Sequence, residues 1–507
     1  MTTRCLFSIS ILLLVPLASS LAQVPAPVEE IPGHPSELQY GDLSFEVPNG
    51  NDYRHTLPNG TVVYVVEDHQ LPLVDISVTL RVGGFLEPDD KRGLAQMTGR
   101  MIRRGGTQSL SAEEFDEKAD FLAAELETST GANQGEASLD CISPVLDESL
   151  ALFFEMLKTP RFQQDRLDLE KEQLLEEMKQ RNDRPQSISS RQWGWLMRGE
   201  DDFLARKISA AELETLTQDD LRQFHRDYWR PDNMIVGVSG DVDTEDILAR
   251  LEQHFSDWEV TGPEVPWPPP APTHQPEPGV FYVQKDIPQG RVLIGHLGYQ
   301  RAGWDDPDVP ALALMNDILG GGGFTSRLVK RIRSDEGLAY SAFSQYGVDI
   351  WWPGIFRMGY QSKSETVALA AKIALEELER IQQEEVSDEE LATAKASFID
   401  VFPRQFESAG RTVGLFVRSE YEGRPPEYWL NYQDNVRAVT KQDVLRAAQE
   451  HLSPENLVFL MVGNWEQIEA GDADGRATMK ELAGGTATEL PMRDPLTLEP
   501  ISPGAGG

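Results

Sequence analysis

Two segments decide the fold of this chain: Leu216–Asp241, LTQDDLRQFHRDYWRPDNMIVGVSGD, and Val439–Asn464, VTKQDVLRAAQEHLSPENLVFLMVGN. They align without a gap at an offset of 223 residues. Each begins with a threonine suited to cap a helix that carries an aspartate in its first turn. A Pro-Asp/Glu-Asn turn then ends the helix, and an apolar run typical of a buried strand follows. The chain therefore contains two copies of one α+β unit.

The two halves also begin alike, with TVVYVVED at Thr61–Asp68 and GVFYVQKD at Gly279–Asp286, each followed by a second apolar strand. Between the halves lies the proline-rich stretch 263–278, which is suited to an extended linker. We predict an α+β fold of two homologous α/β-sandwich domains, 46–262 and 279–468. Each is expected to be a mainly antiparallel sheet covered by helices.

Within the first half, Glu125–Gly131 and Gly135–Ser143 alternate polar and apolar residues and predict a hairpin. Long amphipathic helices are predicted at Asp147–Thr159 and Asp165–Pro185. The segment 469–507 is rich in Gly, Ala, Thr and Pro, so we expect a flexible tail.

The N-terminus predicts export. Arg4 precedes the apolar run Leu6–Leu17, which is too short to span a bilayer, and Ser20–Ala22 supplies small residues before a cleavage site at Gln23. We expect residues 1–22 to be a signal peptide and 23–45 a flexible leader. No later segment is long and apolar enough to anchor the chain, so a periplasmic or secreted protein without a membrane anchor is expected.

The formal net charge of −37 argues against nucleic acid or anionic membrane as partner. This negative charge either keeps the protein soluble or attracts basic substrates. Cys5 falls within the predicted signal, which leaves Cys141 alone, so the mature chain has no intramolecular disulfide. Cys141 lies in a strand-like run, where a buried structural thiol is favoured over a nucleophile.

A set of ordered segments carries a family resemblance: LPNGTVVYVVED, GLAQMTGRMIRRGGT at Gly93–Thr107, LALFFEMLKTPRF, LEKEQLLEEM, and DILGGGGFTSRLVKRIRSDEGLAYSAFS in the second half. With them the chain resembles the insulinase (pitrilysin) metallopeptidases, specifically the bacterial branch that is similar to mitochondrial processing peptidase. The resemblance runs from about Asp52 to Trp465. It implies a peptidase fold and peptide substrates.

Active members of that family carry His-x-x-Glu-His on a helix, where the histidines bind zinc and the glutamate polarises a water molecule. The resemblance places Gln96, Gly99 and Arg100 at these three positions, and none of them suits the role. Glu177 is retained at the position of the distal zinc ligand, 77 residues after Arg100, with Glu170 two helical turns earlier. We expect Arg100 to pair with Glu177 in place of the metal.

No replacement site is visible in the sequence, since the eight histidines are scattered and none has a partner at ligand spacing. A site assembled only in three dimensions stays open. GVSGD at Gly237–Asp241 is no nucleophile elbow, and GGGGFTSR at Gly320–Arg327 lacks the end of a phosphate loop. We therefore expect no cofactor in this chain and zinc in a partner subunit.

The second half, in contrast, retains two residues that the family uses in its active site. Arg333 and Tyr340, in RIRSDEGLAYS, match an Arg and Tyr that in the family hold the substrate backbone and stabilise the oxyanion. Gly320, Gly321, Gly322 and Gly323 resemble a shortened form of the family's glycine-rich substrate loop, although a helix-to-turn hinge explains them equally well.

In several members the work is divided between two chains, one with the zinc motif and one with the Arg/Tyr pair. The sequence fits the second description: a non-catalytic subunit that forms a heterodimer with a zinc-bearing homologue and supplies Arg333 and Tyr340 in trans. The hairpin at 125–143 corresponds to the peptide-binding edge of the catalytic subunit. The alternatives are a structural or peptide-binding role without proteolysis, and a self-sufficient hydrolase with a replaced metal site.

Overall fold

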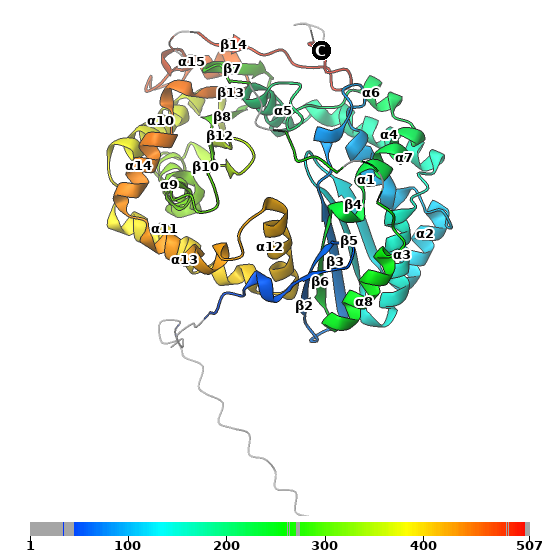
Figure 1. Cartoon of the computed structure of the whole chain (residues 1–507). Coiled ribbons are helices and arrows are strands. Elements are labelled where there is room, and N and C mark those ends of the chain that lie inside the picture. The colour runs from blue at the N-terminus through cyan, green and yellow to red at the C-terminus, as the bar shows by residue number, and fades with distance from the viewer. Residues whose placement is uncertain are drawn as a thin grey trace, which may run out of the picture. The chain divides into compact units, whose positions relative to one another are not determined.

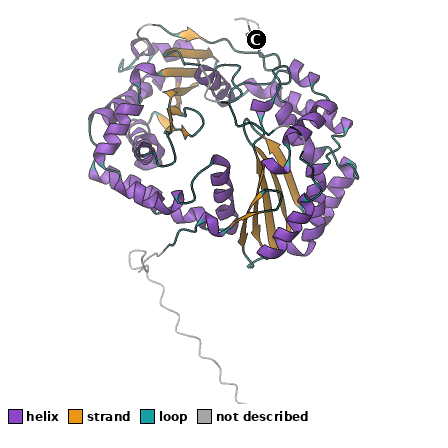
Figure 2. Ribbon diagram, in the orientation of Figure 1, coloured by secondary structure: helices purple, strands orange, loops and turns teal. Residues whose placement is uncertain are grey.

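The computed structural model describes His34 and residues 45–501, apart from Thr261, Pro263, 270–273, Ala483 and Gly485. The predicted signal peptide, and the leader except for His34 and Phe45, lie outside the described residues. The chain divides between Glu46 and Val47, and the second unit is Val47–Gly507. Within it, two six-stranded sheets are covered by helices (Figures 1 and 2), so the predicted two-domain α+β fold is confirmed.

Five strands of the two sheets follow the same order, as a duplication requires, and the sixth strand of each sheet, at one edge, comes from a different place in the chain. The first sheet, in spatial order, is β1 (Arg54–Thr56), β2 (Val62–Glu67), β6 (Met234–Gly240), β3 (Leu73–Leu80), β5 (Gly135–Ile142) and β4 (Glu125–Thr130). The second is β14 (Thr488–Glu489), β7 (Gly279–Gln284), β13 (Val458–Gly463), β8 (Gln289–Leu297), β12 (Ile355–Lys363) and β10 (Ala339–Tyr346). A small parallel pair, β9 (Tyr299–Gln300) and β11 (Val348–Asp349), extends from the second half.

The helices follow the same repeat. The first half contains α1 (Leu94–Arg104), α2 (Ala112–Leu122), α3 (Leu146–Lys158), α4 (Gln164–Lys179), α5 (Pro185–Arg198), α6 (Ala210–Thr215), α7 (Gln218–Tyr228) and α8 (Thr244–Phe255). The second contains α9 (Asp308–Asn316), the π-helical η7 (Asp317–Gly321) and η9 (Val329–Asp335), α10 (Val367–Gln383), α11 (Asp388–Ile399), α12 (Ala409–Glu422), α13 (Tyr428–Ala438), α14 (Lys441–His451), α15 (Trp465–Ala470) and α16 (Met479–Leu482). No described helix is long and apolar enough to cross a membrane.

The repeated segment that predicts the fold has the predicted local structure in both copies. Thr217 accepts a hydrogen bond from Asp220 N at the start of α7, and Thr440 does so from Asp443 N at the start of α14. Both are reciprocal capping boxes, which satisfy backbone donors that a helix end otherwise leaves open. The following strands, β6 and β13, lie inside their sheets and are almost wholly buried.

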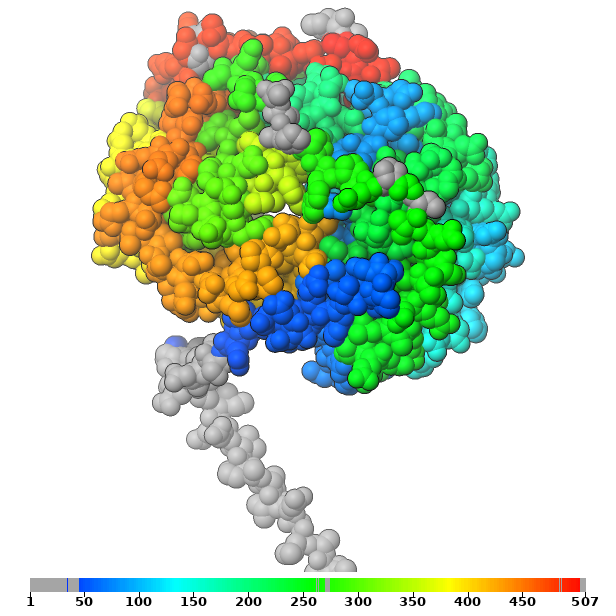
Figure 3. All heavy atoms as spheres, viewed as in Figure 1, coloured from blue at the N-terminus to red at the C-terminus, as the bar shows by residue number. Residues whose placement is uncertain are grey.

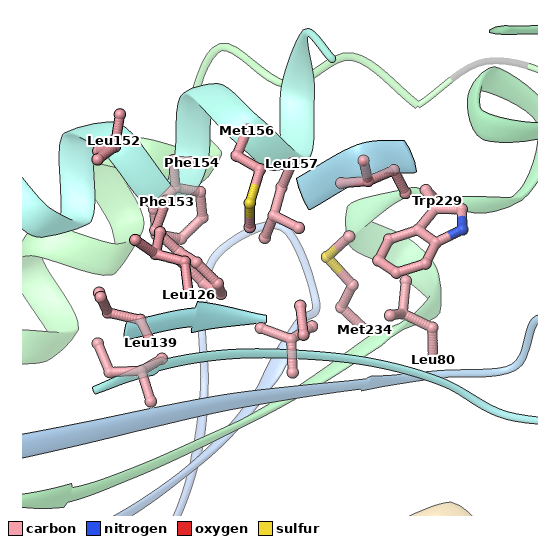
Figure 4. Packing of buried hydrophobic residues seen from close by; sticks show 14 of the residues in the cluster. Leu80, Leu126, Leu139, Leu152, Phe153, Phe154, Met156, Leu157, Trp229 and Met234 are labelled. Atoms are coloured by element: carbon pink, nitrogen blue, oxygen red, sulfur yellow. The ribbon is translucent and has the colours of Figure 1, made fainter. Parts of the chain in front are cut away.

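Each sheet buries one face under the helices of its own half. Figure 4 shows this core in the first half, where Leu126 and Leu139 of the sheet lie near Phe153 and Phe154 of α3. The side chain of Cys141 is buried in the same core, as expected of a structural thiol. Burial raises the pKa of the Cys141 thiol to about 11, so the thiolate is not formed near neutral pH.

The other face of each sheet receives a helix from the opposite half. The helix α12 lies beside the first sheet (Figure 1), where its Phe416 and Val417 pack on Tyr64. Ile188 and Trp193 of α5 pack on the second sheet. The helices α5 and α12 occupy equivalent places in the two copies, so the exchange is reciprocal. It makes one folded unit of two halves that each have their own core.

The expectation of a flexible tail is wrong as far as Ile501. The strand β14 pairs in parallel with β7 and supplies the edge that β1 supplies in the first sheet. Beyond it, Leu496 O accepts a hydrogen bond of 2.8 Å from Ala210 N of the first half. Composition suggested mobility, but the segment covers an otherwise open sheet edge, which is a stabilising tertiary contact.

Candidate functional site

The helix α1, which corresponds to the family's metal-binding helix, is held firmly at its first turn. Glu87 Oε1 accepts a hydrogen bond of 2.8 Å from Ala95 N, and Arg206 Nη2 lies 2.7 Å from Glu87 Oε2. The apolar face of the helix, including Met97 and Met101, is buried in the core, while Gln96 is exposed. The segment thus folds as a normal amphipathic helix, although its metal-binding residues are missing.

Gly99 occupies a position where no side chain fits. A Cβ atom built there would lie 2.5 Å from Thr130 Oγ1, 2.6 Å from Thr130 N and 2.8 Å from the Ser129 carbonyl carbon. Thr128 Oγ1 also donates a hydrogen bond of 2.6 Å to Gly99 O, which fixes α1 against β4. Two of the three obstructing atoms belong to backbone, so a side chain here requires α1 and β4 to separate. The catalytic glutamate is therefore absent, and the space for it has closed.

Arg100 pairs with Glu177 as predicted. Arg100 Nη2 lies 3.5 Å from Glu177 Oε2, and Arg100 Nη1 lies 3.8 Å from Glu170 Oε2. Glu170 is buried and forms a second, shorter ion pair with Arg104 on the next turn of α1. Because of this pair, the Glu170 carboxylate raises the pKa of Arg104. Permanent guanidinium groups therefore neutralise the two acidic residues, and this cluster does not suit zinc.

One group of possible metal ligands does assemble in three dimensions among the described residues: Asp308, Glu450 and His451. Its carboxylates are already neutralised, because Arg446 Nη1 lies 2.7 Å from Asp308 Oδ1 and 3.1 Å from Glu450 Oε2. His451 Nε2 completes the cluster at 2.8 Å from Asp308 Oδ2. A bound cation would have to compete with the arginine, so this group is an ion-pair network joining α9 to α14.

The residues singled out in the second half come together in space. Arg333, near the end of η9, lies between two rings, with its Cζ 4.5 Å from the Phe324 centroid and 4.5 Å from the Tyr340 centroid. Both aromatic side chains are largely exposed, Phe324 at 71% and Tyr340 at 83%. No carboxylate of the described residues lies within 4.0 Å of the Arg333 guanidinium. A cation and a phenol are thus held together, by cation–π contacts, on an open surface.

The glycine-rich segment positions Phe324 in this cluster. A Cβ on Gly320 would lie 2.3 Å from Ser344 N of β10, so glycine is required where η7 crosses this strand. Gly321 and Gly322 lie against the preceding helical turns at Asn316 and Asp317, whereas Gly323, with a φ of +60°, has open space beside it. The hinge interpretation of the sequence therefore accounts for Gly320 to Gly322, and Gly323 leads directly to the exposed Phe324.

A groove of about 810 Å³ lies between the uncovered face of strands β3, β5 and β4 and the helix α12. Its charged lining residues are Glu127, Glu136, Asp349, Arg418 and Glu422. The outer edge of β4 is partly occupied, because Arg103 Nε donates a hydrogen bond of 2.8 Å to Leu126 O. The predicted hairpin is thus present as β4 and β5, but one backbone acceptor of its edge strand is already used.

Comparison with known proteins matches these observations. The model for insulinase (peptidase family M16) matches residues 62–193, and the model for the peptidase M16 inactive domain matches residues 215–398. The chain belongs to the insulinase family, peptidase family M16. Gln96, Gly99 and Arg100 stand at its His-x-x-Glu-His positions, and its second half matches the model for the family's inactive domain.

Individual M16 relatives are distant but cover most of the chain. A non-peptidase homolog, YmxG of Helicobacter pylori, is 24% identical over 78% of this chain and 90% of its own length. YmxG of Bacillus subtilis, an uncharacterized zinc protease, is 24% identical over 68% of this chain and 81% of its own. Among solved structures, a peptidase M16 inactive domain from Pseudomonas fluorescens has a TM-score of 0.73 at 23% identity, over 81% of this chain and 97% of its own.

Sequence reasoning found Arg333 and Tyr340 but missed Phe324. The signal for it was present, since a phenylalanine follows the four glycines and lies nine residues before Arg333. Arg104 was also missed as the partner of the buried Glu170. It stands one helical turn after Arg100 on the same face of α1, so the spacing alone could have indicated it.

Proposed function

We propose that this chain is the non-catalytic subunit of a heteromeric M16 peptidase and pairs with a zinc-bearing homologue. The observation that carries the proposal is the exposed cluster of Arg333, Phe324 and Tyr340. A guanidinium and a phenol are held together there without any acidic partner in the described chain. Gly99 and Arg100 of α1, in contrast, are engaged in contacts within the chain.

The cluster has the chemistry that peptide hydrolysis needs opposite a metal. Attack on a peptide carbonyl places negative charge on its oxygen, and Arg333 and Tyr340 are donors suited to that oxyanion. The two rings restrict the guanidinium, which reduces the reorganisation needed when the charge develops. In this proposal the chain binds and orients the peptide and donates hydrogen bonds, while the partner supplies the zinc. The glycines at 320–323 position Phe324 at the same site.

Mixing the two chains tests this proposal. We expect little cleavage of a peptide by either protein alone and zinc-dependent cleavage by the 1:1 mixture. Activity of this chain alone would contradict its assignment as non-catalytic. A mixture no faster than the zinc-bearing homologue alone would contradict a role in trans. An adjacent reading frame with an intact His-x-x-Glu-His identifies the first homologue to test.

Export remains part of the proposal, because the predicted signal peptide lies outside the described residues. The proposed site of action is the periplasm or the exterior of the cell. N-terminal sequencing of the protein recovered from the periplasmic fraction would test this, with Gln23 as the expected first residue. Recovery of the uncleaved chain from the cytosol would contradict it.

A second candidate function, peptide binding without proteolysis, is favoured by the groove over strands β3, β5 and β4. Three of its carboxylates, Glu127, Glu136 and Asp349, form no ion pair with a described residue. Close by on the same sheet, Asp75 and Asp140 face each other across β3 and β5. Burial and the neighbouring Asp75 raise the pKa of Asp140 to about 7, as expected where carboxyl groups are crowded. A basic peptide that binds this chain equally well with and without the homologue, with no cleavage in the mixture, would support this second role.

A further inference from the structure

A second cavity, of about 470 Å³, opens beside α1 and α4, where active relatives of this family hold their metal. Gln96 and Glu177 line it, and so do Arg92, Arg181, Arg206 and Lys207. The cavity is therefore rich in cations although the whole chain has a net charge of −37. Such a local excess calls for a physical explanation, because the protein has many carboxylates with which to neutralise it.

Some of these charges are balanced by neighbours in the chain. Arg206 pairs with Glu87 at 2.7 Å, Arg92 pairs with Asp201 at 2.7 Å, and Glu177 pairs with Arg100. Two cations remain. No carboxylate of the described residues lies within 4.0 Å of Arg181 or of Lys207. Lys207 also forms no hydrogen bond with any described residue.

Arg181 is held in place by neutral acceptors. Its Nη1 donates to Pro495 O at 3.0 Å and its Nη2 donates to Ile208 O at 2.9 Å, so the C-terminal segment helps to fix it. Behind it lies the buried Arg191, whose Nε has no hydrogen-bond partner and whose Nη2 bonds only to Asn182 Oδ1, at 2.7 Å. Arg181, Arg191 and Lys207 therefore lie near one another with no ion-pair partner among the described residues.

The pKa values agree with this unrelieved positive field. Burial, followed by the charge of Arg191, lowers the pKa of Arg181. Lys207 is exposed, yet partial desolvation of its ammonium and the charges of Arg181 and Arg191 still lower the Lys207 pKa. A bound anion would oppose these effects, since it favours the charged form of each group.

We infer that this cavity is a binding site for a carboxylate, supplied by an acidic side chain or by the C-terminus of a peptide. An ammonium together with a fixed guanidinium is the combination that proteins use for carboxylates. The volume suits a side chain or a chain end with its immediate neighbours. In this view the former metal site has exchanged a bound cation for fixed cations, and so binds a group of opposite charge.

Titration of the full mature chain with peptides of matched sequence tests the site. The first probe is an acetylated and amidated hexapeptide with one central glutamate, compared with the same peptide carrying glutamine. The second is an uncharged hexapeptide with a free C-terminal carboxylate, compared with its amide. Ligand-observed NMR suits the weak binding expected. The peptide pair whose two members differ in affinity identifies the source of carboxylate that the cavity accepts, a side chain or a C-terminus.

We expect the carboxylate peptide to bind about tenfold more tightly than its neutral counterpart, as for a charge-assisted hydrogen bond. Lys207→Gln should lower that affinity about tenfold and leave the neutral peptide unaffected. Lys118→Gln, an equal change of charge on α2 outside the cavity, should change it less than twofold. Added salt should weaken binding of the carboxylate peptide to the wild-type chain.

Equal binding within both peptide pairs would overturn the inference, and so would a Lys207→Gln variant that binds like the wild type. The comparison of peptides on the wild-type chain does not depend on the folding of any variant. The inference goes beyond the proposed function, because it needs neither a partner nor peptide cleavage. The mixing experiment can therefore fail while this one succeeds, and the reverse is equally possible.

Discussion

The two places where an M16 peptidase does its chemistry differ sharply in this chain. Around α1, two of the three residues at the family's motif positions are engaged within the protein: Gly99 is packed against β4, and Arg100 is paired with Glu177 and Glu170, while Gln96 is exposed. Around η9, Arg333 contacts the rings of Phe324 and Tyr340, and both rings face solvent. Both regions lie on one folded unit, whose surface is shown from one side in Figure 3.

Under the proposed function, this difference separates the half of a divided site that has been lost from the half that has been kept. Where a function is lost, side chains in the site tend to find partners inside the protein, because an unpaired charge or an unfilled space costs stability. Where a function is kept, polar and aromatic groups remain exposed at the expense of contacts they could have made. The following predictions test this contrast, from the largest expected effect to the smallest.

Gly99→Ala should lower the free energy of unfolding by about 3 kcal/mol, because the added methyl group meets the backbone of β4. Chemical denaturation measures the change. Gly414→Ala on α12 is the matched control, since no atom lies within 4 Å of its Cβ position, and it should be neutral or stabilising. Equal stability of the two variants would show that the space beside α1 is not closed.

Arg333→Ala should lower kcat of the active mixture about 100-fold, as expected when a donor to an oxyanion is removed. The free energy of unfolding should change by less than about 0.5 kcal/mol, because the side chain forms no ion pair with any described residue. Arg437→Ala, on exposed α13, is the control for loss of a surface arginine. A rise in KM with unchanged kcat would assign Arg333 to substrate binding alone.

Phe324→Ala should lower kcat in the same mixture about fivefold. Removing one ring leaves the guanidinium less restricted, and a cation–π contact at an exposed site is worth about 0.5–1 kcal/mol. Phe324→Leu keeps the apolar volume without the ring and should behave like alanine. If leucine restored the full rate, Phe324 would act through its bulk, and its contact with Arg333 would be irrelevant.

Arg100→Ala should cost less than about 1 kcal/mol in the free energy of unfolding, because its partner Glu177 is 58% exposed and the pair is screened by solvent. Arg104→Ala should cost more, since it removes the closest partner of the buried Glu170. A double-mutant cycle of Arg100 and Glu177 measures the pair directly. A coupling energy above about 2 kcal/mol would mean that the ion pair replaces the metal as a structural element.

Sequence patterns predicted most of the fold, because the local preferences for helix and strand agree with the tertiary packing. The repeated helix-turn-strand segments carry their own capping residues, so Thr217 and Thr440 predict helix starts without any knowledge of packing. The segment after Ile468 was misjudged for the opposite reason. Its composition suggests a flexible chain, yet Thr488 and Glu489 complete a sheet edge and Leu496 reaches the first half. Such contacts are non-local and leave no periodic signal.

For the candidate site, too, some features could be read from the sequence and others only from the structure. The sequence by itself determined that the zinc motif is replaced at Gln96, Gly99 and Arg100, because the spacing of a helical motif can be read directly from the chain. Only the tertiary structure decided that the space at Gly99 has closed, that Arg333 lies between Phe324 and Tyr340, and that Arg181 and Lys207 have no carboxylate partner among the described residues. These facts depend on which atoms lie within a few ångströms of one another across distant segments, and distance through space is not encoded in spacing along the chain.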